Sequence, residues 1–158
     1  MIKKLLKNNI VNNVLDEEVA VLLSGGVDSI SVALAAHDVG KKVVPYTFHL
    51  KGQESYDSKT AKKFSDSMGW DCKTIVVPTE NLVDDWYNLV KLGCKKKTHF
   101  ECVFPFLYVY PAIKEKYVLT GWGADGYFGV SKKAMMRYSN DKKWDNYTKY
   151  CKKHNQKQ

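Results

Sequence analysis

The stretch 19–29, which reads V-A-V-L-L-S-G-G-V-D-S, limits what this chain can fold into more than any other part of it. Its first five residues are apolar, and a short apolar run bounded by turn residues is typical of a fully buried strand. Ser24, Gly25 and Gly26 break the run, and an apolar-periodic segment that predicts a helix begins at Ile30. The sequence therefore predicts a strand, a glycine turn and a helix in immediate succession.

This succession is suited to binding an anion. Two glycines let backbone N–H groups approach an anion without interference from Cβ atoms, and a helix N-terminus adds unpaired donors and the positive end of its dipole. Ser24 and Ser29 place hydroxyls on either side of the loop, and Asp28 stands where a carboxylate can cap the helix. We expect phosphate as the occupant; the plainer alternative is an N-cap beside a tight turn. The loop lacks the G-x-x-x-x-G-K-[ST] pattern of a Walker A motif.

Apolar periodicity and turn residues divide the rest of the chain into alternating strands and helices. Further strands are expected over 43–50, 71–77 and 117–120. Helices are predicted over 2–15, 30–36, 55–68, 81–92, a buried aromatic stretch 100–116 interrupted by Pro105 and Pro111, and from 141 onward. The stretch 93–98 is interpreted as a basic loop. This order predicts an α/β fold, a doubly wound and mainly parallel sheet with helices on both faces and strand order 3-2-1-4.

Length and composition indicate one domain over 1–158, with a motif-bearing core at 19–130 and a basic helical segment at 131–158. The chain is 44 % hydrophobic, and none of its apolar runs approaches the ~20 residues of a membrane span. The first fifteen residues lack a continuous signal-peptide core, so a cytoplasmic protein without membrane contact is expected. The cysteines have neither C-x-x-C nor zinc spacing, which favours reduced, mostly buried thiols over the alternative of a redox pair formed by Cys94 and Cys102.

The net charge of +8 belongs to the end of the chain. From Lys132 onward there are 9 basic residues against 2 acidic ones, whereas the two signs nearly balance before Ser131. A basic tail of this kind is usually a solvated surface, but beside a nucleotide site it can also attract polyphosphate or nucleic acid. Nucleic acid is the less favoured partner.

A second glycine-rich segment follows the predicted fourth strand. It reads T-G-W-G-A-D-G-Y-F-G over 120–129, and four glycines there let the backbone approach a ligand closely. In a 3-2-1-4 sheet the first and fourth strands are neighbours, so both glycine loops are expected to leave adjacent carboxyl ends and face one crevice. Asp28 and Asp125 are the only acids in the two loops, and we assign them as Mg²⁺ ligands, because Mg²⁺ prefers one or two carboxylates plus phosphate oxygens.

These motifs carry a family resemblance that covers about 19–130. L-S-G-G-V-D-S at 23–29 resembles the PP-loop of the N-type ATP pyrophosphatases, and 119–129 is similar to the pattern L-S-G-E-G-A-D-E-L-F-G-G-Y in the synthetase domains of asparagine synthetase and β-lactam synthetase. The resemblance implies a HUP-like (adenine nucleotide α-hydrolase-like) fold, ATP cleaved between its α and β phosphates, and Mg²⁺ on Asp28 and Asp125. The residues that it implies for nucleotide binding are Leu23, Ser24, Gly25, Gly26, Val27, Asp28, Ser29, Phe48, Thr120 and Gly121.

In that family a substrate carboxylate attacks the α-phosphate, and an amine then displaces AMP. The acceptor implied here is an amino acid or another small-molecule carboxylate, and a homo-oligomer is compatible with the sequence. Trp122 stands where the family has a glutamate that serves the second half-reaction, Gly126 replaces a second acid, and an indole cannot accept a proton. The chain opens with Met1-Ile2-Lys3, without the nucleophilic cysteine of a glutaminase domain, so free ammonia, another amine or an ammonia-donating partner would supply the nitrogen. Lys132 is the candidate for the family's catalytic lysine.

Two other functions fit parts of the sequence. Lys95, Lys96, Lys97 and the basic tail suggest an RNA-modifying PP-loop enzyme, such as a tRNA thiolase or lysidine synthetase, although the sequence shows neither C-x-x-C nor a separate RNA-binding module. Trp122 instead suggests an ATP- or AMP-binding protein that has lost its chemistry. Salt-sensitive tRNA binding would indicate the first, and nucleotide binding without turnover the second.

Overall fold

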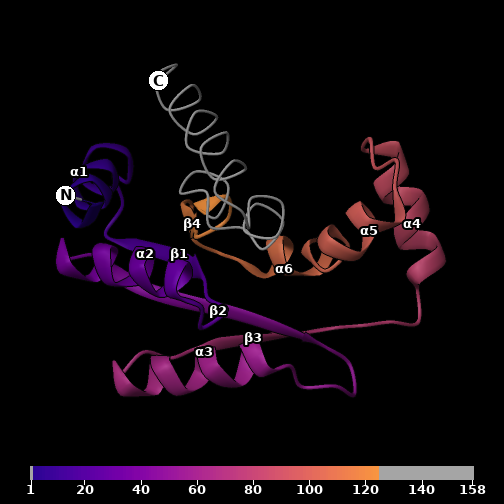
Figure 1. Ribbon diagram of the computed structural model, residues 1–158, viewed down its shortest axis with the longest axis horizontal. Helices are drawn as coiled ribbons and strands as arrows, with labels where there is room; N and C mark the ends of the chain where they lie inside the picture. Colours follow the sequence, from indigo (N-terminus) through magenta and orange to yellow (C-terminus); the bar gives the residue numbers. More distant parts are fainter. Residues whose placement is uncertain (1, 125–158) are drawn as a thin grey trace, which may run out of the picture. The chain divides into compact units, whose positions relative to one another are not determined.

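The sheet of this protein is parallel, with strand order β3-β2-β1-β4, in a computed structural model that describes residues 2–124 (Figure 1). The strands are β1 (Glu18–Leu22), β2 (Lys42–Leu50), β3 (Lys73–Val77) and β4 (Val118–Thr120). β1 lies at the centre, with Leu22 in register with Tyr46 of β2 on one side and Thr120 of β4 on the other. The predicted strand order is confirmed. Because β1 and β4 are parallel neighbours, the chain leaves both strands at the same edge of the sheet.

Helices cover both faces of this sheet, as predicted. They are α1 (Ile2–Asn13), α2 (Val27–Asp38), α3 (Tyr56–Ser67), α4 (Leu82–Lys91), α5 (Lys97–Val103) and α6 (Phe106–Ala112). One apolar cluster joins Val19 and Val21 of β1 to buried residues of α1, α2 and α3, and a second joins Val77 of β3 to Leu89, Phe104 and Val109. Side chains alternate between the two faces along each strand, so each face supports its own cluster.

Within the predicted helical stretch 100–116, the interruption at Pro105 is confirmed, but the extent and the burial are not. The stretch forms two short helices, and Pro105, which has no N–H to donate, lies between them as the N-cap residue of α6. Pro111 is tolerated within the single turn that ends α6. The stretch is also less buried than expected, since α5 contains no buried residue and the Tyr110 side chain is exposed. α5 begins at Lys97, inside the segment 93–98 that we predicted to be a loop.

The chain divides into two compact units, 1–120 and 121–158, and of the second the structure describes 121–124. The helix predicted from residue 141 and the basic tail lie outside the described residues. No helix in the described range 2–124 is long and apolar enough to cross a membrane.

The three cysteines that the structure describes, Cys72, Cys94 and Cys102, are free thiols. Burial raises the pKa of Cys72, and the Cys94 thiol lies 3.7 Å from the carbonyl oxygen of Lys96. The expectation of mostly buried thiols is wrong for these three, since Cys72 and Cys94 are half-buried and Cys102 is exposed. Cys151 lies outside the described residues.

A charge cluster fastens α1 to the end of α2 and makes stability depend on pH. Hydrogen bonds from the ammonium groups of Lys7 and Lys3, each 2.9 Å away, lower the pKa of Asp38 from 3.8 to about 2. The carboxylate therefore stabilises the fold fully above pH 3.8, and the contribution is lost as the pH falls towards 2. We expect Asp38→Asn to lower the melting temperature slightly at neutral pH, because exposed ion pairs contribute little. The difference from wild type should shrink as the pH is lowered from 3.8 through 2 in a calorimetric pH series, and a constant difference would contradict this assignment.

Candidate functional site

The segment between β1 and α2 turns within three residues at the carboxyl edge of the sheet. The Leu23 N–H donates to the carbonyl oxygen of Tyr46 at 2.8 Å, which continues the pairing with β2 one residue beyond β1. Gly25 then has a φ of +79°, a left-handed conformation that L side chains rarely adopt. Gly26 is the N-cap residue of α2, with φ −76° and ψ 159°, so the helix begins at Val27 rather than at Ile30. The first-turn N–H groups of α2, which lack carbonyl partners within the helix, therefore belong to the glycine loop.

α3 packs directly against this loop. A Cβ atom placed on Gly25 would lie 2.5 Å from Cγ2 of Thr60, 2.6 Å from its Cβ and 3.0 Å from the Ala61 nitrogen. The Thr60 hydroxyl donates to the Tyr56 carbonyl at 2.9 Å, which fixes its methyl group towards the loop. Gly25 is thus required by both its backbone conformation and this contact. Sequence reasoning missed Thr60 because no motif marks a residue on another helix that closes on the loop.

Two serine hydroxyls hold the loop from inside. Ser29, only 6 % exposed, donates to the Gly26 carbonyl at 3.0 Å and accepts from the Ser24 N–H at 3.3 Å. The two hydroxyl oxygens lie 3.1 Å apart, and the Ser24 hydroxyl also accepts from the Gly26 N–H at 3.3 Å. Ser24 is exposed, so its hydroxyl can exchange these partners for a ligand, whereas Ser29 is a structural element of the turn.

Asp28 does not cap α2, which corrects that part of the prediction. The cap position belongs to Gly26 and makes no side-chain hydrogen bond, while Asp28 lies in the first turn of the helix and is half-buried. Among the described residues its carboxylate has no hydrogen-bond or ion-pair partner. Because Asp28 lies in the first turn of α2, directly after the loop, its carboxylate is available to a cation that accompanies a bound phosphate. The dipole of α2 stabilises the negative charge of this carboxylate.

The other predicted nucleotide-binding residues occupy different environments. Val27 is 76 % exposed beside the loop, whereas the Leu23 side chain is buried in the apolar cluster and offers a ligand only its backbone. Phe48 packs edge-on against Phe106, with ring centroids 5.6 Å apart, in the cluster beneath α6. Thr120 is exposed at the end of β4.

Part of the predicted site belongs to the second unit or lies outside the described residues. Gly121 begins that unit and accepts a hydrogen bond from the Ala124 N–H at 3.3 Å, and the Trp122 side chain is 93 % exposed. Asp125 and Lys132 lie outside the described residues, so the assignment of Asp125 to Mg²⁺ stays a prediction.

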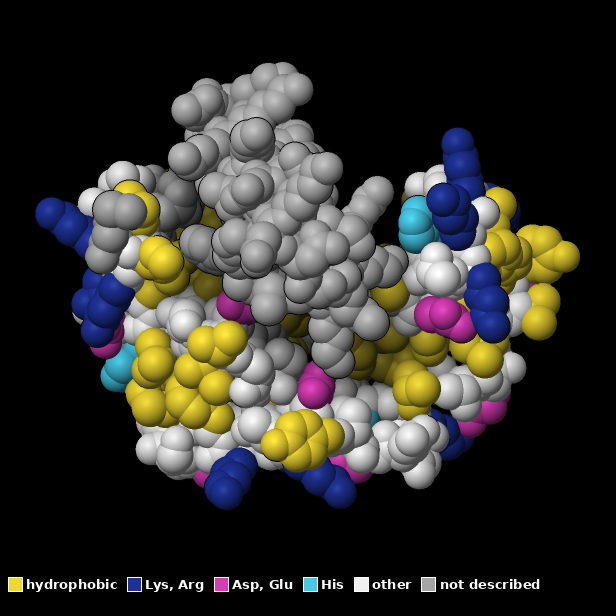
Figure 2. Space-filling view, viewed as in Figure 1, with side chains coloured by type: hydrophobic (Ala, Val, Ile, Leu, Met, Phe, Trp, Pro, Cys, Tyr) yellow, Lys and Arg dark blue, Asp and Glu magenta, His cyan; other side chains and the backbone are white. Residues whose placement is uncertain are grey.

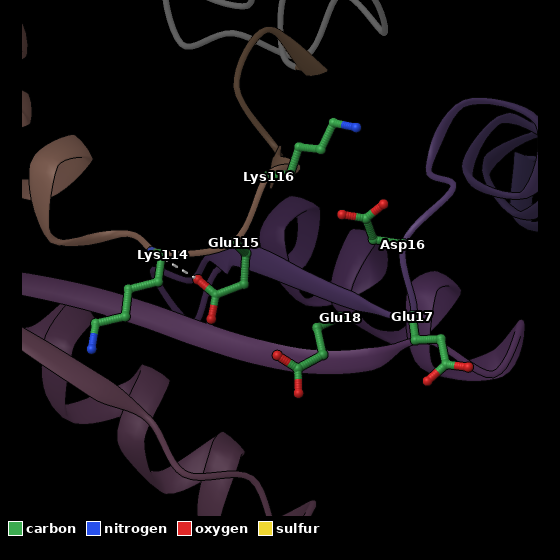
Figure 3. Close-up of a pocket in the computed structure, with 6 residues that line it drawn as sticks. All are labelled: Asp16, Glu17, Glu18, Lys114, Glu115 and Lys116. Atoms are coloured by element: carbon green, nitrogen blue, oxygen red, sulfur yellow. Dashed lines mark hydrogen bonds between the residues drawn. The ribbon is translucent and has the colours of Figure 1, made fainter.

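A pocket of about 400 Å³ lies at the opposite end of the sheet, before β1 and β4 (Figure 3). It is lined by Asp16, Glu17, Glu18, Lys114, Glu115 and Lys116. Glu18 pairs with Lys42, whose hydrogen bond lowers the pKa of the Glu18 carboxyl, and Lys73 lies 3.9 Å from Glu115. Ligands of open parallel sheets bind at the carboxyl ends of the strands, so we do not assign the nucleotide to this pocket.

The hydrogen bonds of Ser29 lead to a prediction for the loop. We expect Ser29→Ala to lower the free energy of unfolding by about 1–2 kcal/mol, because the Ser24 N–H loses its acceptor in a part-buried turn. Ser24→Ala should be milder in chemical denaturation, because the hydroxyl that it removes is exposed. Equal losses from the two substitutions would contradict the structural role given to Ser29.

Comparison with known proteins agrees with this architecture. NMN synthetase from Francisella tularensis aligns with a TM-score of 0.55 at 16 % identity, over 84 % of this chain and 58 % of that one. The NH3-dependent NAD synthetase from Campylobacter jejuni aligns with a TM-score of 0.53 at 16 % identity, over 82 % and 57 %. At these identities the likeness establishes the fold alone, and this chain spans less than two thirds of either protein.

No curated protein sequence gives a significant match. The sequence profile of the asparagine synthase family, in contrast, matches residues 2–157. The match includes the glycine loop, the parallel sheet and the segment after β4. The chain therefore belongs to the asparagine synthase family, within the PP-loop ATP pyrophosphatases, a superfamily of ATP-using enzymes.

Proposed function

We propose that this protein is a cytoplasmic adenylating synthetase that converts ATP to AMP and pyrophosphate while activating a carboxylate, such as that of an amino acid. The observation that carries the proposal is the loop 24–29. The φ of Gly25, the close packing of Thr60 on that glycine and the position of the loop at the N-terminus of α2 hold the turn against α3, with its backbone at the start of the helix. A polyphosphate would bind such a loop through backbone N–H groups and the helix dipole.

The reaction follows from where charge moves. A carboxylate oxygen of the acceptor attacks the α-phosphorus, the bond from that phosphorus to the α–β bridging oxygen breaks, and pyrophosphate leaves with the electron pair. The loop N–H groups and the Ser24 hydroxyl would hold the departing phosphates. Bound Mg²⁺ would supply charge neutralisation, and its ligands would be Asp28, which has no side-chain partner among the described residues, and Asp125. We propose Lys132 as a further catalytic residue.

The second half-reaction depends on a nitrogen donor. With an indole at 122 in place of an acid, we propose that free ammonia, or ammonia from a partner protein, attacks the acyl carbon of the acyl-adenylate. The C–N bond of the amide forms, the bond from the acyl carbon to the phosphate oxygen breaks and AMP leaves, and the proton from nitrogen goes to AMP or water rather than to a side-chain base at 122.

The test is to incubate the purified protein with Mg²⁺ and ATP, adding individual amino acids and other carboxylates, with and without ammonium. Separation of the nucleotides should reveal AMP and pyrophosphate in equal amounts, dependent on one class of carboxylate. ADP and phosphate as products would contradict the proposal, and so would tight ATP binding without turnover across the panel.

A further inference from the structure

α4 presents an apolar stripe to solvent. Val83, Tyr87 and Val90 are 70 %, 61 % and 42 % exposed and recur at helical spacing, and Leu82 joins them at 38 %. Figure 2 shows hydrophobic side chains at the surface over α4, beside lysine side chains. Contiguous exposed apolar surface on one helix is characteristic of an interaction site.

The opposite side of α4 is firmly attached to the domain. Leu89 is buried in the cluster around Val77, and Asp85 is 5 % exposed. The Tyr108 hydroxyl of α6 donates to both carboxylate oxygens of Asp85, at 2.9 Å each. These contacts fix the rotation of α4 about its own axis, so the stripe cannot turn inward to bury itself.

Two opposite charges border the stripe on one side. Asp84 and Lys91 are seven residues apart, which places them on the same edge of the helix about two turns, or roughly 10 Å, from each other. Both are exposed, and neither forms an ion pair with another described residue.

We infer that the stripe binds a second copy of this chain, with the two α4 helices antiparallel about a twofold axis. The twofold axis runs perpendicular to both helix axes and to the line that joins the two helices. Rotation about it reverses the direction of the helix and keeps its charged edge on the same side of the interface. Asp84 of one copy then faces Lys91 of the other, and the pair occurs twice. Parallel α4 helices would place the two charged edges on opposite sides, where they could not pair.

The proposed interface is small. α4 has ten residues and is about 15 Å long. An interface of this size belongs to the weak, transient class of protein–protein contacts, so we expect a reversible dimer that forms at elevated protein concentration. The inference is independent of the proposed reaction, because none of these residues belongs to the glycine loop.

Sedimentation equilibrium of the full chain, between about 1 and 200 µM, tests the inference. We expect a monomer–dimer equilibrium that Val83→Glu weakens on the order of 100-fold, because it places two carboxylates within the apolar contact. Asp84→Lys and Lys91→Asp should each weaken association by about tenfold, since each creates two like-charge contacts. The double variant with both substitutions should restore it to within about twofold, because the pairs return with their signs exchanged.

Lys63→Asp, an exposed charge reversal on α3, is the matched control and should leave association unchanged. Circular dichroism verifies that each variant is folded. A wild-type monomer throughout the concentration range would overturn the inference, as would a dimer insensitive to Val83→Glu. A double variant no stronger than the single ones would overturn the antiparallel arrangement. Binding of a monomeric chain to lipid vesicles would assign the stripe to a membrane surface instead.

Discussion

Gly25→Ala is expected to lower the free energy of unfolding by about 3 kcal/mol, because the added Cβ atom both strains the backbone conformation and clashes with α3. A φ of +79° is unfavourable for any residue with a Cβ, and that Cβ would lie 2.5 Å from Thr60 Cγ2. In this size of chain the loss corresponds to a fall in melting temperature of roughly 10 °C by scanning calorimetry. ATP affinity should fall with it, because relief of the contact moves the loop away from α3.

Two matched variants separate these causes. Gly26→Ala should be nearly neutral for stability, because its φ is −76° and its Cβ would meet only the Ser24 hydroxyl oxygen, at 3.4 Å. Thr60→Gly added to Gly25→Ala removes the closest contacts but not the φ penalty, so it should recover part of the loss. If Gly26→Ala were as destabilising as Gly25→Ala, the conformation assigned to the loop would be wrong.

Asp28→Asn is expected to reduce AMP formation on the order of 100-fold or more while leaving the protein folded. The substitution keeps the shape of a half-buried side chain that has no partner among the described residues, so the free energy of unfolding should change little. What it removes is the negative charge that would hold Mg²⁺ against the phosphates. The loss of activity should therefore appear as weaker binding of MgATP in calorimetry, with a smaller change for ATP in EDTA.

Asp38→Asn is the control for this experiment. It makes the same chemical change at the other end of α2, in the cluster with Lys3 and Lys7, and should leave ATP turnover unchanged. Undiminished turnover in Asp28→Asn would exclude the metal role of this carboxylate.

The residues of 19–29 were enough to predict the strand, the loop, the helix and their succession. Repetition of that pattern also predicted the parallel sheet and its order, because each β-α-β connection has a preferred hand. The boundaries were less predictable. Loop residues such as Val27 and Asp28 were not expected inside α2, since polar and β-branched residues carry little signal for a first turn. Pro105 marked the interruption of the aromatic stretch, but the start of α5 at Lys97 and the end of α6 at Ala112 were not predicted.

Within the candidate site, the sequence by itself determined the chemistry: two glycines, two hydroxyls and one carboxylate around the N-terminus of a helix. Only the tertiary structure decided how they are used. It buried Ser29, left Asp28 without a partner among the described residues, and brought Thr60 of α3 against Gly25, thirty-five positions earlier in the chain. It also left the stripe on α4 exposed, although its periodicity equally fitted a buried helix. The physical reason is that periodicity and spacing report on neighbours along the chain, whereas burial and close contact depend on elements that meet only when the sheet is assembled.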